Sequence, residues 1–185
     1  WGLGKLNLSD PDQNTVWELL DSSHSALLLL ARGYSRSASY EQSNVADEWA
    51  RAVLSDRSWS VERQAEFLAA LPATPNIWEL AEQRGKETEE NYWHRFQYAG
   101  LPERGEACVT ATQKLLEFGR PNVAIDVLGL YQEYFPSPGP QPELVLEALN
   151  KLLTMSAPGP FDSHRVEELF EYLSKIDFEG KENKL

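Results

Sequence analysis

Apolar residues recur every three or four positions through most of the chain after residue 44, which is the spacing of one face of an α-helix. From Val61, for example, Ala65, Leu68 and Leu71 share one face, and we place Gln64 with the charged residues on the opposite face. The same spacing predicts further helices near residues 45–53, 77–81, 92–96, 108–118, 124–135, 146–153 and 166–176. No alternation of Val, Ile and Thr of strand length occurs there. The pattern therefore predicts an all-α fold.

Prolines and capping residues divide this pattern into separate helices. Proline suits the first position of a helix, because its missing N–H group would be unpaired there in any case and its fixed φ fits. Prolines precede the amphipathic stretches at Pro75, Pro102, Pro121 and Pro142. Ser60 and Thr74 should cap the helices that follow them, since a hydroxyl oxygen accepts a hydrogen bond from the first turn. Each of these positions predicts a helix start.

Glycines and loop-forming residues predict where the helices end. Gly85 and Gly119 follow amphipathic stretches, and glycine often ends a helix in a left-handed conformation. After Gly85 we expect a polar segment over residues 86–91 before the next helix begins. Loops are expected over residues 136–142 and 157–162.

The beginning and the end of the chain give weaker patterns. A short helix is expected over residues 16–20, and the apolar residues 26–31 form a buried helix or a buried strand, since periodicity does not separate the two. We interpret 26–31 as helix, because no second strand-like stretch is present to pair with it. Residues 35–43 resemble a loop, and residues 179–185 form a charged tail that should fray.

Together these elements predict one all-helical domain over residues 1–178, built from stacked antiparallel helical hairpins. A division into a less regular part, 1–58, and helical-hairpin repeats, 59–178, is the alternative that the pattern leaves open. The length of 185 residues and the hydrophobic content of 42% fit either organisation. Because the chain begins with Trp1 rather than Met, we expect it to be a piece of a longer protein.

The charge and composition argue against several classes of partner. A net charge of -12 and a pI near 4.7 disfavour nucleic acid, whose binding depends on Lys and Arg, and disfavour an anionic membrane surface. The longest apolar stretch, residues 26–31, is far shorter than the roughly 20 residues that span a bilayer. No secretory signal is recognisable. The single cysteine, Cys108, fits a reducing compartment, so we expect the protein in the cytoplasm.

Four positions of one predicted hairpin follow a family pattern: Gly119, Ala124, Leu128 and Pro136. The hairpin that contains them resembles a tetratricopeptide unit, a repeat of about 34 residues formed by two helices. In its first helix, Cys108 and Thr112 occupy positions where that family has a large aromatic and a small residue. The resemblance implies a tetratricopeptide-like, α/α-solenoid-like stack whose groove binds peptides or other domains.

A second stretch carries another resemblance. It runs from Leu71-Pro72 through Trp78-Glu79-Leu80 and Gly85 to Tyr92-Trp93. This stretch is similar to helical-repeat regions of long multidomain bacterial proteins, including some nucleotide-triphosphatase defence and signalling proteins. The resemblance carries no catalytic residue, and it implies a supporting or sensing role in a larger protein.

The reactive side chains predict no active site and no metal site. The three histidines, which are far apart in the sequence and form no helix-spaced ligand set, are His24, His94 and His164. The run Asp162-Ser163-His164 has the residue types of a hydrolase triad, but adjacent residues rarely converge in that way. We interpret Asp162 or Ser163 as the cap of the last helix. Cys108 lies on an apolar stripe, so we expect it in the core. We expect no catalytic, cofactor-binding or metal-binding residue, and a hydrolase that uses His164 or Cys108 is the least favoured hypothesis.

Large aromatic residues supply the candidate contact surface, which consists of Trp59, Trp78, Tyr92, Trp93 and Tyr131. The sequence favours a non-enzymatic helical-repeat module that mediates protein–protein or interdomain contacts within a larger protein. Because the chain is acidic, a neutral, apolar or basic protein or peptide is the expected partner. The alternative is a sensor whose ligand pocket is lined by four of these residues, namely Trp78, Tyr92, Trp93 and Tyr131.

Overall fold

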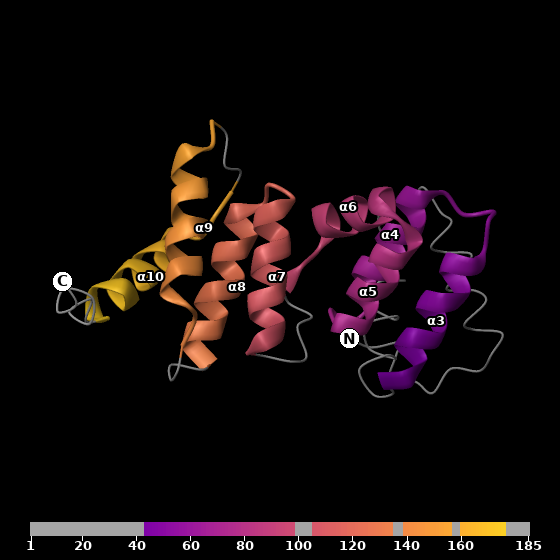
Figure 1. Cartoon of the computed structure of the whole chain (residues 1–185), viewed down its shortest axis with the longest axis horizontal. Coiled ribbons are helices and arrows are strands. Elements are labelled where there is room, and N and C mark those ends of the chain that lie inside the picture. Colours follow the sequence, from indigo (N-terminus) through magenta and orange to yellow (C-terminus); the bar gives the residue numbers. More distant parts are fainter. Residues whose placement is uncertain (1–42, 99–104, 135–138, 157–159, 177–185) are drawn as a thin grey trace, which may run out of the picture. The chain divides into compact units, whose positions relative to one another are not determined.

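A computed structural model describes residues 43–98, 105–134, 139–156 and 160–176 of the chain. Within these ranges it contains eight α-helices and no strand (Figure 1), so the all-α prediction is confirmed. The predicted elements at 16–20 and 26–31, nearly all of the loop at 35–43 and the tail at 179–185 lie outside the described residues. None of the described helices is long and apolar enough to cross a membrane.

The chain divides into two compact units, Trp1–Pro102 and Glu103–Leu185, whereas the sequence suggested one domain over 1–178 or a division into 1–58 and 59–178. In the first unit the described helices α3 to α6 pack against one another, and in the second unit α7 to α10 do the same. Each unit therefore has its own core. A periodic pattern shows which face of a helix is buried but not which other helices cover it, so this division was not visible in the sequence.

The first unit contains four described helices: α3 (Ser43–Ser55), α4 (Val61–Ala70), α5 (Pro75–Arg84) and α6 (Lys86–Arg95). Helix α4 packs mainly against α6, and α3 contacts both α4 and α5. Two helix starts are capped as predicted. The hydroxyl of Ser60 accepts a hydrogen bond from the backbone N–H of Arg63 at 3.3 Å, and the hydroxyl of Thr74 accepts one from Ile77 at 3.4 Å.

The junction between α5 and α6 differs from the prediction. Gly85 ends α5 as expected, and its φ of 128° is a backbone angle that residues with a side chain rarely adopt. However, α6 begins at the next residue. The polar segment expected over residues 86–91 is therefore helical. Its Lys and Glu residues have high helix propensity, and one glycine suffices to change the direction of the chain.

Gln64 was predicted on the solvent face of α4, and this was wrong, because its side chain has 0% exposure. Its amide nitrogen donates hydrogen bonds of 3.0 Å to the backbone carbonyls of Val53 and Asp56, at the end of α3 and just after it. Its amide oxygen accepts a hydrogen bond of 3.2 Å from Nε of Arg84 in α5. The buried amide of Gln64 thus has hydrogen-bond partners for both its nitrogen and its oxygen, and it joins α4 to α3 and α5.

The second unit contains α7 (Glu106–Glu117), α8 (Pro121–Tyr134), α9 (Pro142–Thr154) and α10 (Ser163–Lys175). Helices α7 and α8 form the predicted hairpin around Gly119, whose φ is 69°. The turn has two hydrogen bonds that satisfy the end of α7. Gly119 N–H donates to the carbonyl of Leu116, and Arg120 N–H donates to the carbonyl of Leu115. This is the Schellman pattern, which requires a left-handed residue at the position of Gly119.

Helix α8 is the centre of the second unit, because it packs against α7, α9 and α10. Its own apolar residues are buried on nearly every side, among them Ala124, Val127 and Leu128. Cys108 on α7 is buried, as its apolar stripe predicted. Near the end of α7, Nζ of Lys151 in α9 donates to the carbonyl of Leu116 at 3.3 Å. One side of α9 therefore faces α7.

Candidate protein-contact surface

Three of the five aromatic residues predicted to form a contact surface lie inside the first unit. Trp78, Tyr92 and Trp93 pack with Phe96 in one cluster, with ring centroids 5.0 to 6.5 Å apart. The side chain of Trp93 is only 1% exposed. At these distances the rings pack directly against one another. The three side chains are core residues of this unit and present almost no surface to a partner.

The other two aromatic residues lie elsewhere. Tyr131 is buried in α8 of the second unit. Trp59 is half-buried just before α4, where it packs edge-on against Phe67 with centroids 6.0 Å apart. The guanidinium of Arg63 lies 4.1 Å from the centre of the Trp59 ring. Trp59 is thus the most accessible of the five, although both of its neighbours hold it against the unit.

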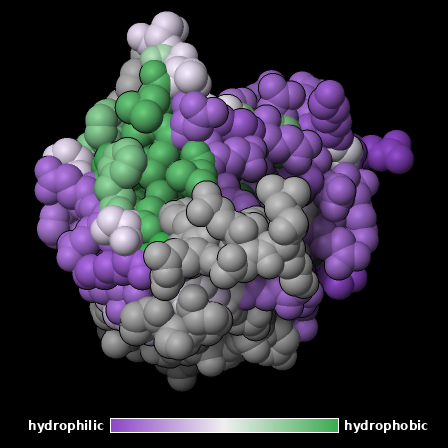
Figure 2. All heavy atoms as spheres, turned by 60° about the vertical axis from the view of Figure 1, so that its left-hand side comes forward, coloured by the Kyte–Doolittle hydropathy of each residue, from purple (hydrophilic) through white to green (hydrophobic). Residues whose placement is uncertain are grey.

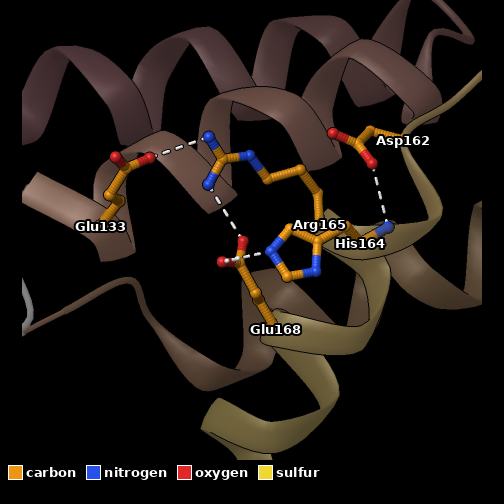
Figure 3. Close-up of polar contacts among 5 residues, drawn as sticks. All are labelled: Glu133, Asp162, His164, Arg165 and Glu168. Carbon is orange, nitrogen blue, oxygen red and sulfur yellow. Dashed lines mark hydrogen bonds and ion pairs between the residues drawn. The ribbon is translucent and has the colours of Figure 1, made fainter.

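The reactive side chains that the sequence drew attention to have structural partners. The carboxylate of Asp162 accepts a hydrogen bond of 2.9 Å from the backbone N–H of His164, so Asp162 caps α10 as predicted. The ring of His164 points the other way and lies 3.2 Å from Glu168 (Figure 3). His94 lies 3.8 Å from Glu90 on the surface of α6. His24 lies outside the described residues. Among those that are described, no three His, Cys, Asp or Glu side chains are grouped so as to bind a metal ion.

The second unit has an exposed apolar face that sequence analysis did not identify. Leu146 and Leu153 on α9 are 46% and 74% exposed, and Phe170 on α10 is 49% exposed. Figure 2 shows apolar residues gathered in one patch on the side where α9 and α10 lie, with hydrophilic residues on both sides of it. We call Leu146, Leu153 and Phe170 the α9–α10 face. The sequence predicted all three within buried stripes.

The α9–α10 face exists because the apolar sector of α9 is wider than the surface that its neighbours cover. The buried residues of α9 are Leu144, Val145, Ala148, Leu149 and Leu152. Leu146 and Leu153 lie beyond this set, on the side of the helix away from Lys151 and hence away from α7. The sequence does contain one signal for this face: the apolar sector of α9 is wider than the face that one packing contact would cover.

One arginine of α10 forms an ion pair with α8. The guanidinium of Arg165 donates to Glu133 of α8 at 2.8 Å and to Glu168 of its own helix at 3.0 Å (Figure 3). Burial lowers the pKa of Arg165, but the hydrogen bonds and charges of Glu133 and Glu168 outweigh this and leave the pKa above its ordinary value. The hydroxyl of Tyr172 also donates to the carbonyl of Pro140, just before α9. These contacts position α10 and with it Phe170.

Acidic residues border the α9–α10 face. Glu143 lies one turn before Leu146, and Glu167 lies one turn before Phe170; both are exposed. Within the described part of the chain neither carboxylate forms an ion pair, whereas Glu147 is paired with Lys151 at 3.0 Å. Burial raises the pKa of Tyr172 in α10, with smaller contributions from Tyr131 and then Glu143. The border of the face is therefore negative and partly uncompensated.

No known protein family matches this chain. Comparison with curated proteins and with solved structures also gives no match.

Proposed function

We propose that this chain is a non-enzymatic helical module that contacts another protein through the α9–α10 face. The observation that carries the proposal is the exposure of Leu146, Leu153 and Phe170 on two neighbouring helices. Exposed apolar residues that gather in one patch rimmed by polar residues often mark a site where a partner binds, most clearly when the patch is large. Fully burying one such side chain is worth about 1.5–3 kcal/mol. Covering the exposed part of these three side chains would give a partner a substantial share of its binding energy.

The resemblance to tetratricopeptide repeats supports the same proposal. In stacked helical repeats each unit buries its apolar face against the next, and a terminal unit needs a polar outer face to stay soluble. The second unit instead presents apolar residues on α9 and α10. A further protein element on this face would complete the stack, as expected for a tetratricopeptide-like module of a larger bacterial protein. We place this contact in the cytoplasm, in line with the single buried thiol of Cys108.

The proposal is tested by selecting peptides from a random display library against the full chain. The variant Leu146→Gln/Leu153→Gln/Phe170→Gln removes the apolar face and keeps residues that suit a helix. Selected peptides should bind this triple variant at least about tenfold more weakly. The control is Tyr98→Gln, which replaces an exposed aromatic residue of the first unit. Peptides that bind the triple variant and the parent equally well would refute the proposal, as would a selection without enrichment.

A further inference from the structure

We infer that the α9–α10 face binds an amphipathic helix that carries Lys or Arg beside its apolar stripe. This inference rests on the proposed function and specifies the class of partner. The shape of the face suits a helix. Leu146 and Leu153 are separated by two turns of α9, or about 10 Å at a rise of 1.5 Å per residue. Phe170 adds an anchor from α10. A helix of about three to four turns, with apolar residues at positions i, i+3 or i+4, and i+7, matches a face of this length.

The charges around the face suit a basic partner. Glu143 and Glu167 border the face on its two helices and have no ion-pair partner in the described ranges. A carboxylate at the edge of an apolar contact favours a cation on the partner and repels an anion. The chain as a whole carries a net charge of -12, which strengthens the preference for a basic partner. A helix with Lys or Arg flanking its apolar stripe satisfies both requirements.

The same charges disfavour a second copy of this chain as the occupant. In a symmetric dimer the same patch lies on both sides of the interface, so residues near the two-fold axis meet their own copies. The acidic border would then face an acidic border, with no basic residue of the face to compensate. Like charges brought together in this way weaken association. A separate basic helix avoids this repulsion.

Two synthetic peptides test the inference with the full-length chain. Both are about 14 residues long and have leucine at the same helical positions, but one carries lysine and the other glutamate at every polar position. We expect the lysine peptide to bind at least about tenfold more tightly in fluorescence anisotropy titrations. Glu143→Gln/Glu167→Gln should weaken its binding about three- to tenfold, as expected for two exposed charge pairs. The matched control, Glu82→Gln/Glu87→Gln, removes two exposed carboxylates from the first unit and should change binding less than about twofold.

The possible results separate this inference from the proposed function. Equal binding of both peptides, lost in the triple glutamine variant, would overturn the basic preference and keep the contact face. Equal weakening by both pairs of Glu→Gln changes would show that only net charge attracts the lysine peptide, and would also overturn the inference. If neither peptide binds and sedimentation shows a dimer that the Leu153→Gln variant lacks, a second copy occupies the face. If neither peptide binds, the chain is monomeric and the display selection fails, both proposals are wrong.

Discussion

Gly129 and Arg165 provide the sharpest test of how the second unit is held together, because replacing the glycine with alanine should stabilise this unit only when the arginine is absent. Gly129 is buried in the middle of α8, and the stem of Arg165 lies directly over it. A Cβ atom added to Gly129 would be 2.6 Å from Cδ of Arg165 and 3.4 Å from both Cγ and Nε. The arginine side chain would therefore have to move.

The change that Gly129→Ala makes in the free energy of unfolding follows from two opposing contributions. Alanine in place of glycine inside a helix stabilises it by about 1 kcal/mol. Moving Arg165 weakens its hydrogen bonds to Glu133 and Glu168, two partly exposed ion pairs worth about 0.2–1 kcal/mol each, and it also removes the packing of the stem against α8. Gly129→Ala should therefore be neutral or destabilise the parent chain by up to about 1 kcal/mol. In an Arg165→Ala chain the same change should stabilise by about 1 kcal/mol, which gives a coupling energy of about 1–2 kcal/mol.

The four proteins of this double-mutant cycle can be compared by urea unfolding. All six tryptophans lie in the first unit, so tryptophan fluorescence reports on that unit alone. The changes should appear in the circular dichroism transition and leave the tryptophan transition unchanged. A Gly129→Ala effect of the same sign and size in both backgrounds would refute the reasoning, because it would mean that Arg165 does not occupy the space above Gly129.

Three further predictions test other parts of the structure. Gly119→Val should destabilise the second unit by about 1 kcal/mol or more, because valine is strained at a φ of 69°. The control is Gly119→Asn, since asparagine tolerates this conformation. Equal melting temperatures for the two variants would contradict the left-handed conformation of residue 119. Gln64→Leu should cost about 1–3 kcal/mol in the tryptophan-detected transition, since the carbonyl of Asp56 loses its hydrogen bond from the amide and that of Val53 keeps only the N–H of Asp56; an unchanged midpoint would show that water replaces the amide. Burial, with a smaller contribution from Asp162, raises the pKa of Asp126, so ionisation of this group opposes folding. Asp126→Asn should therefore stabilise the chain near neutral pH, and the gain should disappear as the pH falls below the ordinary value of 3.8; a gain that persists in acid would point to another cause.

The parts of the fold that depend on local chemistry were predicted correctly from the sequence. Ser60 and Thr74 cap their helices, and Pro75, Pro121 and Pro142 begin theirs, because capping and proline effects act within one turn. The left-handed glycine of the α7–α8 hairpin follows from the same kind of local reasoning.

The errors arose where the environment of a residue is set by the packing of one helix against another. Gln64 looks like a surface residue until the end of α3 places two carbonyl groups beside it. The aromatic residues of α5 and α6 were candidates for a contact surface, but each of these helices covers the rings of the other. Leu146 and Phe170 follow a helical period, and that period does not reveal whether a neighbour covers them. Which of these apolar residues stay exposed therefore became visible only with the packing of α8, α9 and α10.

The exposed leucines of α9 are not needed to form this helix, which is why they point to a partner. The helix packs through other residues, among them Val145, Ala148 and Leu149. Lysine and glutamate have nearly the same helix propensity as leucine, so a charged residue at position 153 would serve α9 equally well and would improve solubility. At 74% exposure, Leu153 gains only about a quarter of the 1.5–3 kcal/mol that full burial would provide, or roughly 0.5 kcal/mol. The remaining apolar surface contributes nothing to the isolated unit, and it contributes to stability only when another protein covers it.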